Sequence, residues 1–333
     1  MTEPTPALDV VAIGNAIVDV LAAASVDDLT ALGLTKGAMT LIDTDRAHDL
    51  YDRMGPALEM SGGAAANTAA GVASLGGRAA FMGRVAGDQL GEVFRHDIRA
   101  AGVVYETAES HDGLPTGRCL IFITPDADRT MNTYLGAANE LMPDDIDTAL
   151  VSRGRITYLE GYLWDPPHAK EAFRTAISAA RDAGQQVAFS LSDVFCVEHH
   201  RTEFTELLTE GVDLVFGNTN EAKSLFLTDD LDDALGRLAE ICPVVAITRG
   251  AEGSSVVVEG ERVEVGSMVL DEVVDTTGAG DLYAAGFLWG WCRGRDPHTC
   301  GRLGALAAAE VISHPGARPE RSLAELAAEL GLI

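Results

Sequence analysis

The second half of the chain alternates short apolar segments with longer segments of helical character, at intervals of roughly 30 residues. After the first of these apolar segments, residues 155–161, apolar residues recur at helical spacing. Pro167 fits the first turn of this expected helix and Gly184 fits its end. Such alternation predicts βαβ units and a parallel sheet with helices on both faces, which is a three-layer αβα domain. The expected strands are residues 155–161, 186–192, 212–218 and 243–250.

The N-terminal half contains segments that do not fit this βαβ pattern. Alternating apolar segments at 117–125 and 129–135 predict a β-hairpin around the acidic turn 126–128, and residues 17–24 and 37–42 are also strand-like. We therefore expect a small sheet beside the α/β core, built from segments near 16–45 and 112–138. No linker rich in Pro, Gly or Ser separates it, so we interpret residues 1–333 as one domain that carries this sheet as a lid.

Polar residues stand where the expected strands end. In open parallel sheets, ligands bind in the crevice beyond the carboxyl ends of the strands. We therefore expect the functional residues of this chain to lie along that edge. The polar residues placed there by the sequence are Asn15, Glu160, Ser192, Asn218 and Arg249.

The charge of the chain excludes two classes of partner. With 51 acidic and 24 basic residues, the net charge is −27, and such a surface repels nucleic acid and anionic lipid. No window holds the roughly 20 consecutive apolar residues of a membrane span, and residues 1–14 lack the basic start of a signal peptide. Five scattered cysteines without a C-x-x-C pair are typical of a reduced compartment, so we expect a cytoplasmic protein.

Two adjacent histidines raise the question of a metal site. His199 and His200 follow Cys196 closely, but a metal site needs further ligands at suitable spacing, and the sequence offers none nearby. We interpret the histidine pair as part of a polar loop that leads into a helix near residues 201–209.

Residues 275–281, DTTGAGD, come directly before the apolar run LYAAGFLWGW. Gly278 and Gly280 allow a sharp turn and a close approach to a ligand. If a helix begins there, the unpaired amides of residues 278–281 form an anion site at the positive end of the helix dipole. Asp281 then has two interpretations, as compensation of that dipole or as a general base beside a phosphoryl group.

A second glycine-rich stretch, residues 60–77, predicts a helix of small residues after Gly62 and Gly63. On this helix Asn67 is a polar side chain that can both donate and accept, which suits a polyhydroxylated substrate. Asp19 lies in a strand-like run, where a carboxylate needs a ligand or a cation as its partner. Two vicinal sugar hydroxyls would satisfy it, although a purely structural, tightly packed helix explains the glycines equally well.

Two further motifs follow expected strands. Asn218 and Glu221 form an N-x-x-E pattern, in which one helical turn brings together groups able to order the waters around Mg²⁺. An Asn N-cap with an acid in the first turn explains the pattern as well. Arg249, within AITRGAEGS at 246–254, suits a phosphate, although a hairpin turn also accounts for the glycines.

Taken together and in chain order, these motifs resemble those of the ribokinase-like (PfkB) family of small-molecule kinases. The matching stretches are SGGAAANTAAGVASLGG with GRVAGDQLG, NTNE and DTTGAGD. Within the family the chain most resembles adenosine kinases, through GNAIVDV, PTGRCLIFIT, LEGYLWDPP, SLSDVF and FGNTNEA. The resemblance implies a ribokinase-like fold with a β-sheet lid. It also implies ATP-dependent phosphorylation of a primary hydroxyl, the 5′-hydroxyl of adenosine.

The resemblance further implies roles for individual residues. Asp281 is the implied catalytic base, beside an anion hole formed by Gly278, Ala279 and Gly280, with Arg129 reaching the phosphates from the lid. The implied ribose ligands are Asp19, Gly63 and Asn67. The residues implied around the base are Asn15, Cys119, Tyr162 and Phe195. The implied ATP site comprises Asn218, Glu221, Thr248, Arg249 and Gly250, with Glu221 binding Mg²⁺ through water. A monovalent cation such as K⁺ is implied near Asp275 and Thr277.

The choice of substrate rests on weaker signals. Tyr162, Trp164 and Phe195 favour a nucleoside base over a free sugar, because aromatic faces stack on purines. Met39 and the pair Met131 and Thr133 depart from the residues that the resemblance would place against the base. The alternatives are a sugar kinase of the same family and a catalytically silent relative that binds a nucleoside. We expect Asp281 to keep an ordinary proton affinity and, by analogy with adenosine kinases, we expect a monomer.

Overall fold

The computed structural model describes residues 8–111, 113–126 and 128–333 of the chain. The first seven residues of the N-terminal segment, and residue 127 of the expected acidic turn, lie outside the described residues. Within the described part, no helix combines the length and the apolar character that crossing a membrane would require.

Nine strands of the described chain form the main sheet, which confirms the predicted α/β class. Neighbouring strands are parallel from β6 to β12, and β13 and β14 add two antiparallel pairings at one edge. All four strands expected in the second half are present, as β9 to β12. In spatial order the strands are β14 (Glu261–Val265), β13 (Ser254–Val258), β12 (Val244–Thr248), β11 (Leu214–Asn218), β10 (Gln186–Ser190), β9 (Gly154–Glu160), β1 (Leu8–Ile13), β5 (Ala79–Met82) and β6 (Val104–Tyr105).

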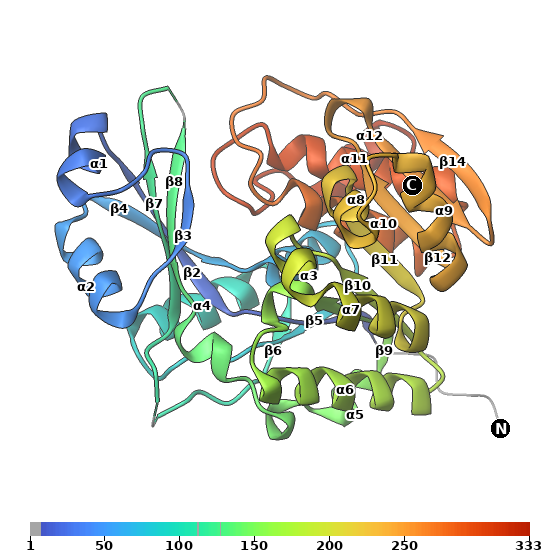
Figure 1. The fold of residues 1–333 in the computed structure, drawn as a ribbon, viewed down its shortest axis with the longest axis horizontal. Helices are drawn as coiled ribbons and strands as arrows, with labels where there is room; N and C mark the ends of the chain where they lie inside the picture. The colour runs from blue at the N-terminus through green and yellow to red at the C-terminus, as the bar shows by residue number, and fades with distance from the viewer. Residues whose placement is uncertain (1–7, 112, 127) are drawn as a thin grey trace.

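Helices cover both faces of this sheet, so the domain has three layers (Figure 1). Alternate residues of β1 face opposite layers: Val10 and Ala12 pack with one set of helices, Val11 and Ile13 with the other. The first set is α3 (Ala64–Ser74), α4 (Gln89–Ala100), α10 (Ala279–Trp291), α11 (Pro297–Val311) and α12 (Leu323–Glu329). The second set is α5 (Thr148–Val151), α6 (Pro167–Asp182), α7 (Val194–Gly211), α8 (Thr219–Phe226) and α9 (Leu231–Ile241).

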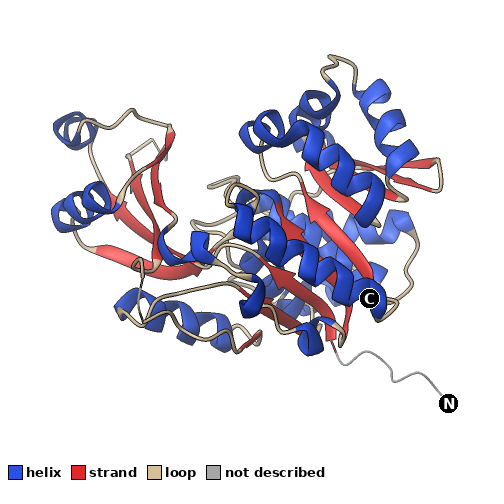
Figure 2. Cartoon of the chain, turned by 60° about the horizontal axis from the view of Figure 1, so that its bottom comes forward, coloured by secondary structure: helices blue, strands red, loops and turns tan. Residues whose placement is uncertain are grey.

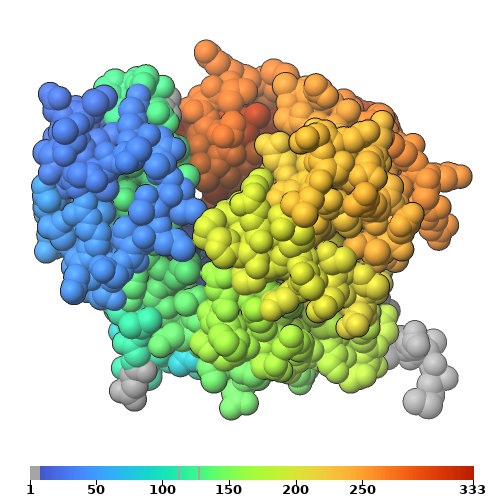
Figure 3. Space-filling view, viewed as in Figure 1, coloured from blue at the N-terminus to red at the C-terminus, as the bar shows by residue number. Residues whose placement is uncertain are grey.

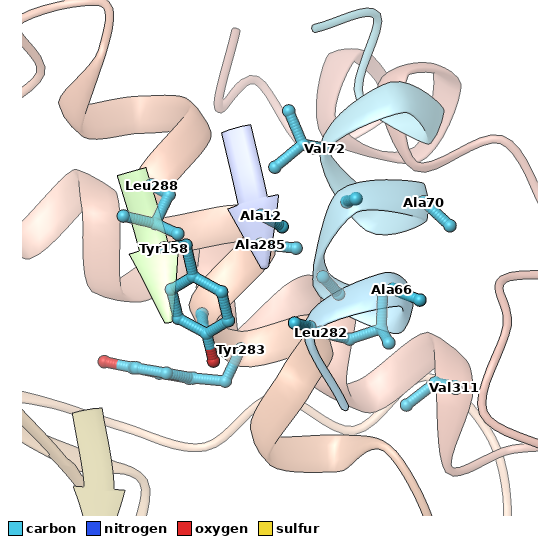
Figure 4. Close-up of a cluster of buried hydrophobic side chains, with 14 of the residues drawn as sticks. Ala12, Ala66, Ala70, Val72, Tyr158, Leu282, Tyr283, Ala285, Leu288 and Val311 are labelled. Carbon is cyan, nitrogen blue, oxygen red and sulfur yellow. The ribbon is translucent and has the colours of Figure 1, made fainter. Parts of the chain in front are cut away.

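Helices α3 and α10, which carry the two glycine-rich motifs, pack against each other in the core. Figure 4 shows their small and medium-sized side chains meeting around Ala66, Leu282 and Ala285. Glycine is required at one contact, because a Cβ on Gly71 would lie 2.6 Å from that of Ala285. The close packing fixes the starts of both helices relative to each other.

A second sheet of five strands stands beside the α/β core (Figures 1 and 2). Its strands in order are β3 (Met39–Leu41), β8 (Arg129–Tyr134), β7 (Gly117–Ile123), β2 (Ile17–Ala23) and β4 (Ala57–Gly62). The predicted hairpin is the antiparallel pair β7–β8. Helices α1 (Val26–Leu32) and α2 (Thr44–Arg53) lie on the outer side of this sheet, away from the core (Figure 2). Strand β4 belongs to the sheet although it lies outside the two segments expected to form it.

One local expectation is wrong. His199 and His200 are not in a loop before a helix, because α7 begins at Val194, where the side chain of Asp193 caps it. The helix is interrupted at His200, whose φ and ψ are −116° and 17°. His200 Nε2 lies 2.6 Å from Asp165 Oδ1. No group of three or more potential metal-ligating side chains occurs in the described chain.

Candidate active site

A cavity of about 660 Å³ lies between the second sheet and the carboxyl edge of the main sheet. Figure 3 shows it as a hollow between the blue and green second sheet and the orange and red C-terminal part. Its walls come from the second sheet, the ends of β9 to β12, and the starts of α3 and α10. The predicted site residues that line it are Asn15, Asp19, Gly63, Asn67, Cys119, Glu160, Tyr162, Ser192, Phe195, Asn218, Glu221, Thr248, Gly250, Thr277, Gly278, Ala279, Gly280 and Asp281.

The start of α10 forms part of the cavity floor. Gly278 is the N-cap, with φ 76°. A Cβ there would lie 2.8 Å from the Cβ of Ala317, in the loop after α11, so glycine is required. The amide of Ala279 donates to Thr276 O at 3.3 Å, whereas no described residue accepts from the amides of Gly280 and Asp281. The expected anion site at residues 278–281 therefore lacks the amide of Ala279, while the amides of Gly280 and Asp281 are available to an anion at the positive end of the helix.

Asp281 lies half-buried in the first turn of α10. Burial raises its pKa from 3.8 to about 6, while the hydrogen bond from Asn67 and the charge of Arg318 oppose this rise. The expectation of an ordinary proton affinity is therefore wrong, because the surrounding protein has removed much of the hydration of the carboxylate. At neutral pH the group is ionised and close to its pKa, which suits a general base.

Asn67 contacts the carboxylate of Asp281. Its Nδ2 donates to Asp281 Oδ2 at 2.9 Å, while its Oδ1 has no hydrogen-bond partner among the described residues. The neighbouring Thr68 hydroxyl donates to the backbone oxygen of Asp281 at 3.1 Å. One turn of α3 therefore holds Asp281 in place.

Asp19 lines the cavity from strand β2, with 8% of its surface exposed. Burial raises its pKa to about 7, against the opposing charges of Arg318 and Arg129. Gly62 lets strand β4 pass close to it, because a Cβ there would lie 2.5 Å from Asp19 Oδ2. A buried carboxylate that faces a cavity is well placed to accept hydrogen bonds from substrate hydroxyls.

Glu160, at the end of β9, is fully buried and ties the neighbouring elements together. It accepts from Asn15 N at 2.7 Å, from Asn15 Nδ2 at 2.9 Å and from Ala65 N at 2.6 Å. Burial raises its pKa to about 7. Gly63 must approach Asn15 closely, since a Cβ would lie 2.1 Å from Asn15 O. Glu160 thus fixes the loop after β1 against the start of α3.

Asn218 and Glu221 form a capping box at the start of α8. Asn218 Oδ1 accepts from the amides of Asn220 and Glu221, and Glu221 accepts from the backbone and side-chain nitrogens of Asn218. The structural alternative for the N-x-x-E pattern is therefore realised. Glu221 also lines the cavity, and burial raises its pKa to about 7. The same carboxylate can serve both the helix and a ligand.

Arg129 reaches from β8 of the second sheet to the DTTGAGD turn. Its Nη2 lies 2.6 Å from Asp275 Oδ2, and both side chains are nearly buried. Asp275 Oδ1 accepts from the amide and the hydroxyl of Thr277, and Oδ2 also accepts from Gly316 N at 2.9 Å. Asp275 and Thr277, expected near a monovalent cation, thus bond to each other and to Arg129.

A second cavity of about 510 Å³ adjoins the first and shares Asn218, Thr248 and Gly250 with it. Arg249 follows β12 and lines this second cavity, but its guanidinium forms an ion pair at 2.7 Å with Glu264 of β14. The expected phosphate ligand is therefore already engaged in an ion pair. The start of α10 lines the larger cavity, and the second cavity adjoins it at Asn218, Thr248 and Gly250, so two neighbouring spaces are available to ligands.

The aromatic residues divide between the cavity and the core. Tyr162 and Phe195 line the cavity and are 37% and 53% exposed, and the ring of Phe195 contacts that of His199 in a tilted arrangement with centroids 4.0 Å apart. The expectation that Trp164 contacts a base is wrong. It is 2% exposed and packs among aromatic residues of the core, because the 3₁₀ turn Gly161–Leu163 directs it inward.

The face of the second sheet that lines the cavity is apolar and rich in sulfur. Met39, Met131 and Cys119 lie on this face, as do Ile17, Leu41 and Ile121. The hydroxyl of Thr133 donates to Cys119 Sγ at 3.2 Å. The positions that departed from the resemblance, Met39, Met131 and Thr133, thus line the cavity and remain candidates for base contacts.

The fold and this cavity define the ribokinase-like class of small-molecule kinases, in which a three-layer α/β core carries a second sheet over the substrate site. The chain belongs to the pfkB family of carbohydrate kinases, whose family model matches residues 28–322.

Solved structures and curated relatives agree with this assignment. A structure of adenosine kinase from Sinorhizobium meliloti is 55% identical, with a TM-score of 0.91, and covers 97% of this chain and 99% of its own. A probable sugar kinase protein from Rhizobium etli CFN 42 is 50% identical, with a TM-score of 0.92 and full coverage of both chains. The adenosine kinase of Saccharomyces cerevisiae is 28% identical, covering 92% of this chain and 95% of the relative.

Proposed function

We propose that this protein transfers the γ-phosphoryl group of ATP to the 5′-hydroxyl of a nucleoside, adenosine in the first place. The observation that carries the proposal is the start of α10, where two free amides and the carboxylate of Asp281 face one cavity. The 55% identity to an adenosine kinase over nearly the whole chain supports the choice of substrate.

Asp281 is the proposed general base. The nucleoside lies in the larger cavity, with its ribose hydroxyls donating to Asp19 and its 5′-hydroxyl directed at Asp281. ATP lies across the adjoining cavity, with its γ-phosphoryl group at the amides of Gly280 and Asp281. The hydroxyl oxygen attacks phosphorus, the bond to the β-phosphate oxygen breaks, and Asp281 takes the hydroxyl proton. The amides stabilise the charge that spreads over the equatorial oxygens.

The second sheet is proposed to act as a lid, with Arg129 as its cationic contact. In the structure Arg129 pairs with Asp275, two residues before Thr277 and close to the anion site. Charge on an incoming phosphate competes with Asp275 for this guanidinium. A sheet that closes over both substrates excludes water, which strengthens electrostatic interactions and limits hydrolysis of ATP.

The residues present fit Mg²⁺ carried by ATP. A small hard cation prefers carboxylate, phosphate and water oxygens and needs few protein ligands. Glu221 offers one buried carboxylate in the larger cavity, bonded to Asn218, which lines both cavities, and the described chain contains no group of three or more potential metal-ligating side chains. We propose that Glu221 and Asn218 hold Mg²⁺ through its waters, where the ion neutralises phosphate charge.

The proposed base pocket combines an aromatic wall with an apolar one. Tyr162 and Phe195 lie on one side, and the sulfur-rich face of the second sheet lies on the other. A flat heterocycle between such walls buries its faces and leaves its edge to Asn15. A free sugar would leave most of these apolar surfaces in contact with water, and this favours a nucleoside.

The test is an ATP-consumption assay with Mg²⁺ and K⁺ on a panel of adenosine, inosine, guanosine, cytidine, ribose and fructose. Rapid turnover with adenosine alone is expected. Turnover with a free sugar alone would keep the kinase and refute the base pocket. If calorimetry detects nucleoside binding but no compound of the panel is phosphorylated, the protein is a catalytically silent relative.

A further inference from the structure

The larger cavity is rich in acidic residues, although the γ-phosphoryl group of ATP is proposed to reach it at the start of α10. Six of the described residues that line it are acidic, and none is lysine or arginine; the six are Asp19, Glu160, Asp165, Asp193, Glu221 and Asp281. Asp281 must be ionised to accept a proton, and an ionised Asp19 can accept hydrogen bonds from hydroxyls through both of its oxygens. A positive charge behind the wall would favour the ionised form of both carboxyl groups.

Arg318 lies behind that wall, in the loop between α11 and α12. Its Nη1 donates to Ala66 O at 2.7 Å, its Nε to Ser61 O at 3.1 Å, and its Nη2 to Ser61 Oγ at 3.2 Å. These acceptors belong to the end of β4 and the first turn of α3. The guanidinium therefore joins β4 and α3 across the Gly62–Gly63 turn. Its acceptor Ala66 directly precedes Asn67 in the first turn of α3.

The same loop also touches the DTTGAGD turn. The amide of Gly316 donates to Asp275 Oδ2, and Ala317 packs against Gly278, where no Cβ would fit. The fully buried Glu310 of α11 fixes the far end of the loop by accepting from the amides of Glu320 and Arg321, at 3.0 and 2.8 Å. Arg318 is thus held rigidly between the two glycine-rich motifs.

We propose that Arg318 is a positioning residue of this active site. Its guanidinium fixes the start of α3 and places a permanent positive charge behind Asp19 and Asp281. The inference rests on the proposed role of Asp281 as proton acceptor. Sequence reasoning missed Arg318, because an arginine in the stretch SHPGARPE carries no pattern that distinguishes it from a surface residue.

The electrostatics agree with this geometry. Asp19 and Asp281 contribute most among the charges that raise the pKa of Arg318, while burial lowers it to about 10, so the guanidinium stays charged at neutral pH. In return Arg318 opposes the rise in pKa of both carboxyl groups. The charged and titratable groups that interact with Asp281 are Arg318, Asp19 of β2, Tyr158 and Glu160 of β9, Tyr162 of the Gly161–Leu163 turn and Glu221 of α8. Arg318 is the cation in this set.

The test measures the titration of Asp281 directly, in full-length protein labelled with ¹³C at the aspartate carboxyl carbons. The Asp281 resonance is assigned by its loss in Asp281→Asn. In Arg318→Gln we expect its midpoint to rise by about one pH unit, as for loss of one nearby charge. Arg318→Lys, which keeps the charge, and Arg321→Gln, which removes an exposed arginine three residues further on, should titrate as wild type.

The kinetic counterpart is the pH profile of kcat/KM. With the midpoint moved from about 6 to about 7, Arg318→Gln should lose about fivefold at pH 6 and little at pH 8. An unchanged Asp281 midpoint in Arg318→Gln would overturn the inference. A raised midpoint in Arg318→Lys would also overturn it, and this second measurement decides the question if the glutamine variant does not fold. A shifted midpoint in a protein that consumes no ATP would support the inference and refute the proposed function.

Discussion

Replacing Asp281 by asparagine should lower kcat strongly while making the protein more stable. The amide cannot accept a proton, so kcat should fall by about 10²–10⁴, the usual contribution of a general base. This corresponds to roughly 3–5 kcal/mol of lost transition-state stabilisation. Nucleoside affinity should stay within about threefold, since the proposed ribose contact at Asp19 is untouched.

The gain in stability follows from the raised pKa of Asp281. A carboxyl group whose folded-state pKa is raised from 3.8 to about 6 contributes stability at low pH, and this contribution is lost as the pH rises through 6. The full shift corresponds to about 3 kcal/mol, and partial solvent access reduces this to about 1–3 kcal/mol at pH 8. Asparagine removes that cost, and its side-chain oxygen can still accept from Asn67. The gain should shrink as the pH falls toward 4.

Three measurements test this reasoning together: kcat by coupled ADP detection, nucleoside Kd by calorimetry, and urea unfolding at pH 8 and pH 5. The matched control is Asp182→Asn, an exposed aspartate at the end of α6, which should change neither activity nor stability. Turnover of the Asp281 variant within tenfold of wild type would refute the base assignment. A variant less stable than wild type at pH 8 would refute the account of a desolvated carboxylate.

Arg129→Met should lower kcat by about 10²–10³ and stability by about 1–3 kcal/mol in urea unfolding, because Asp275 keeps only neutral donors. The control is Arg174→Met, which breaks an exposed ion pair with Glu171. Equal losses of kcat and stability in the two variants would contradict the role of Arg129. The ligand-free protein should melt several degrees lower at pH 8.5 than at pH 6, since the stability contributed by Asp19, Glu160 and Glu221 is lost as the pH rises through about 7. A melting temperature that is flat or rises with pH, measured by calorimetry, would count against their burial as carboxylates.

The sequence alone determined the fold class and the two glycine-rich motifs, because local patterns specify them. Helical spacing and short apolar runs are properties of neighbouring residues, and they correctly predicted β9 to β12 and the hairpin of β7 and β8. The turn before Asp281 could also be predicted, since glycine at a helix start with an acid in the first turn is a local signature.

Tertiary structure alone decided which polar and charged groups meet. The contacts of Asn67 with Asp281, of Arg129 with Asp275 and of Arg318 with Ser61 join residues far apart in the chain, and no local pattern specifies them. For the same reason Trp164 could not be assigned to the core from its sequence neighbours. The raised pKa of Asp281 depends on burial by elements from both ends of the chain. The residue type alone therefore does not reveal it.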